Sequence, residues 1–196
     1  MDKFNGPEDE ALVRAAMAGD RDALRALWHR NRGWIAAILL AHKPRQADLE
    51  DLLQTVAMTI VRTVHTVRDE QAFKPWLRTV ATNVARAAGR KQKVESRVRL
   101  TGTDRPEPAE VGDREHAQRV LDLARQLPDG YREPLLLRCV KGMSYREIAR
   151  VLEIPETTIE TRIARGRRML RELARDEGAG EVELVARKKG TVDVRS

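Results

Sequence analysis

Residues 143–155 read Met-Ser-Tyr-Arg-Glu-Ile-Ala-Arg-Val-Leu-Glu-Ile-Pro, and residues 156–168 continue as Glu-Thr-Thr-Ile-Glu-Thr-Arg-Ile-Ala-Arg-Gly-Arg-Arg. Ser144 and Glu147 have the three-residue spacing of a capping box, which starts a helix. Ala149 is small at a position where a second helix must cross closely, and a proline closes the first segment. The pattern predicts a helix-turn-helix.

The second helix of this unit would present short hydroxyls and long guanidinium groups on its outer face. Such side chains can bind phosphates and base edges in the major groove of DNA. A glutamate among them can accept a hydrogen bond from a cytosine amino group. A plain helical hairpin with a charged face would have the same spacing, so both interpretations stay open. The residues expected to contact DNA are Thr157, Thr158, Glu160, Thr161, Arg162, Arg165 and Arg168.

A second candidate nucleic-acid surface lies on a helix expected to begin near Phe73 and to run toward Arg90. Its apolar residues fall on one side, and the other side combines an aromatic ring, a hydroxyl, an amide and guanidinium groups. Such a row can stack on an unpaired base, hydrogen-bond its edge and hold its phosphates. An ordinary core tryptophan is the alternative interpretation of Trp76. The row is Trp76, Thr79, Asn83, Arg86 and Arg90.

Positive charge is distributed unevenly along the 196 residues, whose net charge is +7. Residues 74–99 carry eight basic side chains and one acidic one, and residues 157–175 carry six and two. Two basic stretches on an otherwise balanced chain indicate contact with a polyanion at two places, although solvated basic helix faces would give the same counts.

Helical periodicity predicts an all-α fold of two small domains. N-caps are expected at Asp20 and Asp48, and apolar residues then repeat at helical spacing, as they do again over 120–170. Periodicity fails near residues 101–109, where Gly, Pro and charged residues are typical of a flexible linker. The expected units are a helical bundle over 1–92, a linker over 93–114, a helix-turn-helix domain over 115–175 and a charged tail over 176–196.

The composition argues against several other classes of protein. One cysteine, Cys139, excludes an internal disulfide framework, and the four histidines have no metal-ligand spacing with it. No glycine-rich phosphate loop or serine nucleophile motif is present, so neither a cofactor nor enzymatic activity is expected. The longest apolar run, residues 34–41, is far below the ~20 residues of a bilayer span, and residues 1–10 are acidic. A cytoplasmic protein is expected.

Three stretches together resemble the bacterial RNA polymerase sigma factors of the sigma-70 family, in its extracytoplasmic-function (ECF) group. Leu-Pro-Asp-Gly-Tyr-Arg-Glu-Pro-Leu-Leu-Leu-Arg over 127–138, with the helix-turn-helix after it, looks like region 4, which binds the minus-35 promoter element. Asp-Leu-Glu-Asp-Leu-Leu-Gln-Thr-Val over 48–56 looks like region 2.2, the docking surface for the polymerase β′ clamp. Phe-Lys-Pro-Trp-Leu-Arg-Thr-Val-Ala-Thr-Asn-Val-Ala-Arg over 73–86 looks like regions 2.3 and 2.4, which melt and read the minus-10 element.

The resemblance implies a sigma factor that binds core RNA polymerase and directs promoter-specific initiation, with no catalytic group of its own. The implied partners are the β′ clamp and β flap of core polymerase, promoter DNA and an anti-sigma protein. Polymerase would dock on Glu50, Asp51 and Gln54, a charged and amide surface away from the leucine stripe of its helix.

The resemblance also implies how the minus-10 strand would be held. Asn83 and the loop over 68–71 would receive an extruded base, and Trp76 would sit at the upstream fork of the bubble. The full set implied for the minus-10 element is Arg68, Gln71, Trp76, Thr79, Asn83, Arg86, Arg90 and Lys91.

Several residues depart from the family pattern. Glu153 stands where the family usually has Gly at the turn, and Glu160 stands where Lys is common. Ala87 replaces a frequent Asp, and Thr55 and Ala57 replace the usual acidic and aromatic residues of the docking motif. We therefore expect a promoter preference that differs from the family's commonest. A stand-alone helix-turn-helix regulator and a sigma-like decoy that binds an anti-sigma protein stay open as alternatives.

Overall fold

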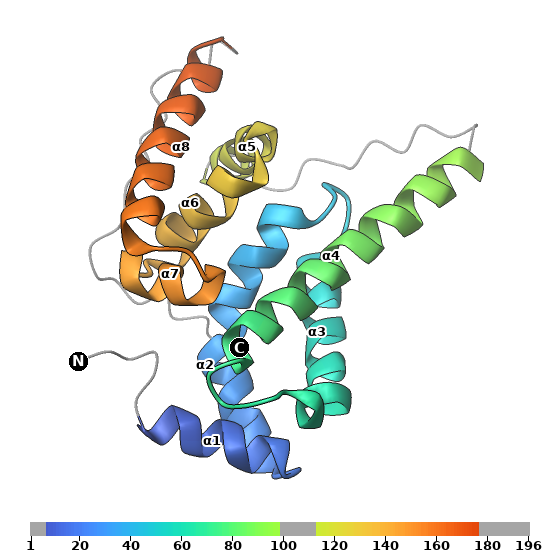
Figure 1. Ribbon diagram of the computed structural model, residues 1–196. Helices are drawn as coiled ribbons and strands as arrows, with labels where there is room; N and C mark the ends of the chain where they lie inside the picture. The colour runs from blue at the N-terminus through green and yellow to red at the C-terminus, as the bar shows by residue number, and fades with distance from the viewer. Residues whose placement is uncertain (1–6, 99–112, 177–196) are drawn as a thin grey trace.

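The computed structural model describes residues 7–98 and 113–176, and every regular element in these two ranges is helical. The all-α prediction is therefore confirmed. Most of the predicted linker and tail, residues 99–112 and 177–196, lies outside the described residues. The elements in chain order (Figure 1) are α1 (Pro7–Met17), α2 (Arg21–His42), α3 (Leu49–Thr63), the short 3-10 helix η1 (Val64–Thr66), α4 (Phe73–Val98), α5 (Asp113–Gln126), α6 (Asp129–Lys141), α7 (Tyr145–Leu152) and α8 (Glu156–Asp176).

Helix α2 is the centre of the molecule, because α1, α3, α4 and α6 all pack against it (Figure 1). It begins after the predicted N-cap Asp20, whose carboxylate accepts hydrogen bonds from the backbone N–H groups of Asp22 and Ala23. The apolar run over 34–41 forms its C-terminal half and is mostly buried. A helix that is apolar on all sides must be covered on all sides, which explains the number of its neighbours.

Helices α3 and α4 complete the N-terminal bundle. Asp48 caps α3 as predicted, and α4 begins at Phe73 with Pro75 in its first turn, where a missing N–H costs little. Helix α4 continues to Val98 and does not end near Arg90 as expected. The reason is local: residues 91–98 contain mostly good helix formers and neither Gly nor Pro.

Helices α5 to α8 form the C-terminal unit, in agreement with the four helices predicted there. Gly142 ends α6 in the left-handed conformation, with φ of 70°, and its N–H reaches the carbonyls of the last turn. The capping box of Ser144 and Glu147 at the start of α7 is confirmed. Helix α7 ends at Leu152 and is capped by Glu153, which has φ of 55°. The turn therefore adopts the glycine-type geometry without a glycine.

The two units pack directly on each other. Helix α6 lies against α2, and α7 lies against α4 (Figure 1). On α2 this contact begins at Gly33, which lies beneath the side chain of Lys141. It ends at Ala41, whose carbonyl oxygen accepts a hydrogen bond from Arg132 at 2.8 Å. Ala37 lies between them at helical spacing and is fully buried. Small residues along this stripe allow α2 and α6 to approach closely.

Replacing Glu153 with Gly is expected to stabilise the protein. The left-handed conformation costs an L-residue ~1–2 kcal/mol, of which the greater freedom of glycine in the unfolded chain cancels ~0.5–1 kcal/mol. We expect a net gain of up to ~1.5 kcal/mol in the free energy of unfolding, measured by urea denaturation. Glu153→Ala removes the same carboxylate and keeps the strain, so it should give no gain. Equal gains for both variants would contradict the explanation.

Candidate nucleic-acid interface

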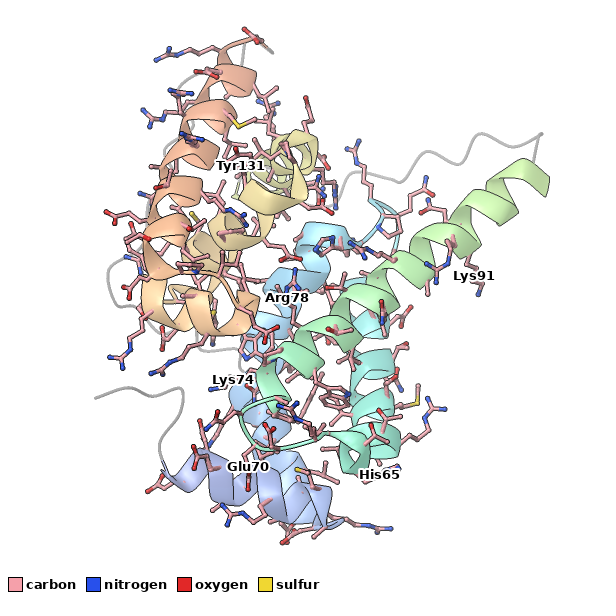
Figure 2. All side chains as sticks on the ribbon, in the orientation of Figure 1. His65, Glu70, Lys74, Arg78, Lys91 and Tyr131 are labelled. Carbon is pink, nitrogen blue, oxygen red and sulfur yellow. The ribbon has the colours of Figure 1, made fainter. Side chains whose placement is uncertain are left out.

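The predicted row on α4 occupies the exposed side of that helix. Thr79, Asn83, Arg86 and Arg90 are exposed, and Leu77 on the other side is buried. Lys91, which directly follows Arg90 in the sequence, lies on the part of α4 that projects past the other helices (Figure 2). A strand that follows the row would therefore meet hydrogen-bonding groups first and positive charges at the end.

Trp76 lies between the core and the surface. Its ring is half-buried and tilted against the buried Phe73, with ring centroids 5.9 Å apart. Packing against Phe73 holds the indole in place, while its exposed part stays available to a base. The core interpretation therefore holds for the buried part of this side chain, and stacking on a base stays a prediction for the exposed part.

The loop before α4 is held by its own side chains. Asp69 accepts from the backbone N–H of Ala72 at 2.8 Å and from Arg68 at 3.0 Å, and these hydrogen bonds hold the pKa of the Asp69 carboxyl below its ordinary value. Glu70 forms an ion pair with Arg14 of α1 at 2.8 Å (Figure 2). Arg68 and Gln71 are exposed next to this anchored segment, close to the start of the α4 row.

Helix α8 presents the predicted minus-35 residues on one side, above the buried Ile159 and Ile163. Thr158 and Arg162 are half-buried at the edge of this surface, and the guanidinium of Arg162 lies near Gly130 at the start of α6. Arg168 is paired with Glu172 one turn further on, at 3.6 Å. The exposed members are Thr157, Glu160, Thr161, Arg165 and Arg168.

The predicted docking residues Glu50, Asp51 and Gln54 are all exposed on α3. Glu50 is already engaged within the protein, because Arg32 of α2 contacts both of its carboxylate oxygens at 2.8 and 2.6 Å. The charge most readily offered to a partner is therefore that of Asp51.

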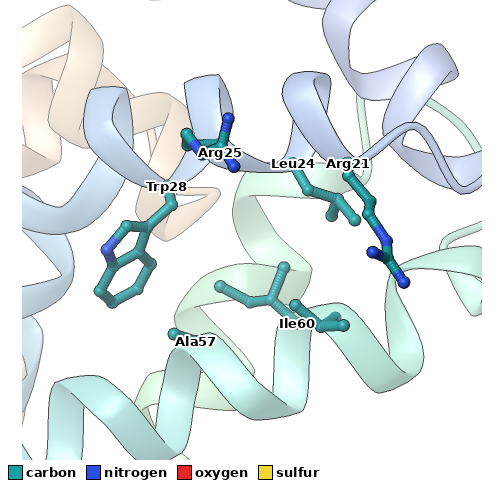
Figure 3. Close-up of a pocket in the computed structure, with 7 residues that line it drawn as sticks. Arg21, Leu24, Arg25, Trp28, Ala57 and Ile60 are labelled. Atoms are coloured by element: carbon teal, nitrogen blue, oxygen red, sulfur yellow. The ribbon is translucent and has the colours of Figure 1, made fainter.

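Sequence analysis missed two apolar residues on the same side of α3. Met58 and Val61 continue the spacing of Asp51 and Gln54 along the helix and are 48% and 62% exposed. They fall outside the amphipathic stripe, and an exposed apolar pair at helical spacing was the available signal. Val61 also borders an apolar groove of about 460 Å³ between α2 and α3 (Figure 3). The groove is lined by Leu24, Trp28, Ala57, Ile60 and Val61, with Arg21 and Arg25 beside them.

A buried carboxylate lies between the two units, and no sequence pattern indicated it. Glu133 of α6 contacts His42 of α2 and accepts from Arg78 of α4 through Nε at 3.1 Å and Nη2 at 2.6 Å. Burial by itself raises the pKa of Glu133, but hydrogen bonds from His42 and Arg78 and their charges outweigh it, so the pKa is lower than usual. The carboxylate is thus ionised and shared between both halves.

Neither Cys139 nor the histidines belong to a metal-ligand cluster in the described part of the chain. Cys139 is half-buried, and burial raises the pKa of its thiol despite the opposing charges of Arg167 and Arg138. No three His, Cys, Asp or Glu side chains among the described residues come together as metal ligands do. No described helix is long and apolar enough to cross a bilayer.

Comparison with known proteins identifies the family. Residues 27–94 match Sigma-70 region 2, and residues 117–170 match Sigma-70, region 4. These two segments contain the α3 and α4 surfaces and the helix-turn-helix, respectively. RNA polymerase sigma factor CarQ of Myxococcus xanthus is 34% identical over 169 residues, which cover 85% of this chain and 94% of that protein. The chain belongs to the sigma-70 family, in its ECF group.

Other relatives of this sigma factor agree with that assignment. The ECF RNA polymerase sigma-E factor of Haemophilus influenzae is 29% identical over 177 residues, covering 83% of this chain and 93% of the relative. Among solved structures, CnrH in complex with the cytosolic domain of CnrY is similar with a TM-score of 0.59 and 24% identity, covering 86% of this chain and 98% of the other. The resemblance inferred from the three sequence stretches is confirmed.

Loss of a cation from α8 should weaken binding to minus-35 DNA. Arg162→Ala and Arg165→Ala each remove a guanidinium placed for phosphates or base edges, so each should cost ~1–3 kcal/mol and reduce the salt slope of binding by about one. The measurement is a salt titration of binding to a duplex minus-35 probe by holoenzyme. Arg119→Ala, which removes an exposed arginine from α5, is the control. A variant that binds like the native protein would place its residue outside the site.

The ionised state of Glu133 predicts a pH dependence of stability. Because its pKa in the folded protein is below the ordinary 4.5, its stabilising effect is complete above that value and is lost as pH falls through the lower folded-state pKa. The difference in free energy of unfolding between the native protein and Glu133→Gln should therefore be largest near pH 7 and shrink below pH 4.5. Glu160→Gln, at an exposed carboxylate, should show no comparable trend. A difference that grows in acid would refute the assignment.

Proposed function

We propose that this sigma factor uses three separate surfaces to direct core RNA polymerase to promoters. Helix α3 docks on the β′ clamp, α4 with its preceding loop melts and reads the minus-10 element, and α8 reads the minus-35 element. The α4 row carries this proposal, because a helix-turn-helix alone would serve any DNA-binding regulator. Polymerase, promoter DNA and the cytoplasm in which they meet follow as partners and location.

The docking surface combines one free carboxylate with apolar area. Asp51 and Gln54 offer charge and hydrogen bonds to a basic coiled coil, and Met58 and Val61 offer surface that loses water on contact. Charge complementarity sets the orientation of the partner, and burial of the two apolar side chains adds affinity.

The melting surface captures bases after they leave the duplex. Opening costs a few kcal/mol for each unstacked base, and stacking on Trp76 with hydrogen bonds from Asn83 can offset that cost without nucleotide hydrolysis. The anchored loop at Arg68–Gln71 forms the wall of this site, since Asp69 and Glu70 hold its backbone in place. Arg86, Arg90 and Lys91 then hold the strand by its phosphates.

The β flap of polymerase and an anti-sigma protein are proposed as further partners. The family resemblance implies both, and the similar protein CnrH is solved with the cytosolic domain of CnrY. The apolar groove beside Val61 is continuous with the proposed docking surface and adds concave area there (Figure 3).

Reversal of charge on α3 should abolish polymerase binding. The variant Asp51→Arg, Gln54→Ala replaces the free carboxylate with a cation that a basic partner repels, so co-elution with core polymerase on size exclusion should be lost. Glu8→Arg reverses an exposed carboxylate on α1 and should leave co-elution intact. If native protein, folded and free of inhibitor, fails to co-elute, the stand-alone regulator or the decoy becomes the better assignment.

Removal of the base-capturing groups should separate binding from melting. Trp76→Ala with Asn83→Ala should keep co-elution with polymerase and reduce open-complex formation at least tenfold, because each base left uncaptured forfeits ~1–3 kcal/mol of stacking. Permanganate reactivity of unpaired thymines in the minus-10 region measures the open complex. Equal loss of polymerase binding and melting would contradict the separation of surfaces.

A further inference from the structure

The segment over 67–72, which joins η1 to α4, is fixed at both ends. Val67 and Phe73 are buried at its two edges, and Arg68 and Gln71 between them are exposed. These two exposed side chains are among those proposed to hold the minus-10 strand. A base is captured at one position only if the backbone that carries such side chains keeps one shape. The contacts that hold this segment therefore bear directly on the proposed minus-10 site.

Helix α1 packs along this segment. It contacts η1 and α2, and its inner side chains Val13 and Ala16 are buried. Arg14 follows Val13 on the exposed side of the helix, and its Nε lies 2.8 Å from a carboxylate oxygen of Glu70. Figure 2 shows Glu70 between the segment and α1. Helix α1 thus reaches the middle of the segment through an ion pair.

A second ion pair joins α1 to the start of α4. Asp9 contacts Arg30 of α2 and lies 4.0 Å from the ammonium nitrogen of Lys74. The side chains of Asp9 and Lys74 are only 16% and 12% exposed, so salt screens this pair less than a surface pair. Lys74 lies in the first turn of α4, where the helix dipole disfavours a cation, and Asp9 supplies the opposite charge. Helix α1 therefore contacts the segment in its middle and directly after its end.

Both carboxylates of the segment are paired with arginines. Asp69 pairs with Arg68 at 3.0 Å, and Glu70 pairs with Arg14. An unpaired carboxylate here would repel the phosphates of a strand that follows the exposed side of α4. Arg14 thus has two effects at this place: it holds the segment, and it balances a charge that would oppose DNA.

We propose that Arg14 is a positioning residue for minus-10 recognition, which acts through Glu70 to hold the segment over 67–72 in the shape that receives an extruded base. Asp9 supports the same shape through Lys74, at the start of α4. The proposal rests on the proposed function, since it concerns how the minus-10 surface is held. Helix α1 precedes residues 27–94, which match Sigma-70 region 2, so that match assigns α1 no role.

Hydrogen exchange on the free chain tests whether the ion pair holds the segment. Arg14→Ala and Glu70→Gln should each speed amide exchange over 67–72 and leave exchange in α8 unchanged. The double variant should exchange no faster than either single one, because both substitutions remove the same ion pair. Glu8→Gln, at an exposed carboxylate of α1, is the control and should exchange like the native protein. Native exchange over 67–72 in both single variants would overturn the role of Arg14.

Promoter selection by holoenzyme tests the consequence for DNA. The probe is a pool of barcoded templates randomised upstream of the transcribed sequence, and the templates that holoenzyme transcribes are identified by sequencing. Arg14→Ala should lower the preference for the selected minus-10 bases about twofold to fivefold, which is the contribution expected of an exposed ion pair. Preference at the minus-35 bases and co-elution with core polymerase should not change, and Glu8→Gln should select as the native protein does.

The outcomes of this selection separate the proposal from the function on which it rests. Unchanged minus-10 preference in Arg14→Ala would overturn the positioning role. Equal loss of preference at both elements would also overturn it, because a general loss of stability would then explain the result. Native holoenzyme that selects no upstream sequence would instead count against the proposed function.

Discussion

The all-round burial of α2 is the constraint on which the rest of the structure depends. Trp34, Ile35, Ile38 and Leu39 have no exposed surface, and the buried indole N–H of Trp34 is satisfied by Asn31 on the same helix. One bundle can cover only part of such a helix, so α1, α3 and α4 cover three sides and α6 covers the fourth. Helices α3 and α4, which carry the proposed docking and minus-10 surfaces, are thus both positioned by this single element.

The same constraint brings the two halves of the chain into contact and makes charge the deciding interaction there. Once α6 lies on the small-residue stripe of α2, Glu133 is carried away from water and must find partners. His42 and Arg78 supply them from two different helices. An interface that depends on one ionised carboxylate is specific, since an apolar replacement would leave Arg78 without its counter-charge.

Features that depend on near neighbours in sequence were predictable, and features that depend on distant pairs were not. The caps at Asp20, Asp48 and Ser144 follow from spacings of two or three residues, and the α4 row follows from helical periodicity. The contact of Glu133 with Arg78 joins residues 55 positions apart, and composition gives no information about which charges pair. The apolar run over 34–41 was a usable signal, because an amphipathic helix of a single bundle needs only one apolar stripe.

On α8, the residues that pack into the core differ from the residues on the outer face. This explains how the chain can depart from the family pattern without losing the fold. Glu160 is exposed on α8 and takes no part in the core, so replacing the common lysine changes what the helix offers DNA and leaves its packing alone. Glu153 is different, because its backbone must adopt φ of 55° whatever the side chain is. The turn keeps its shape because Ile154 N–H bonds the Ala149 carbonyl and the helices on either side are packed. Selection on promoter sequence can therefore act on the outer face of α8 almost independently of selection on stability.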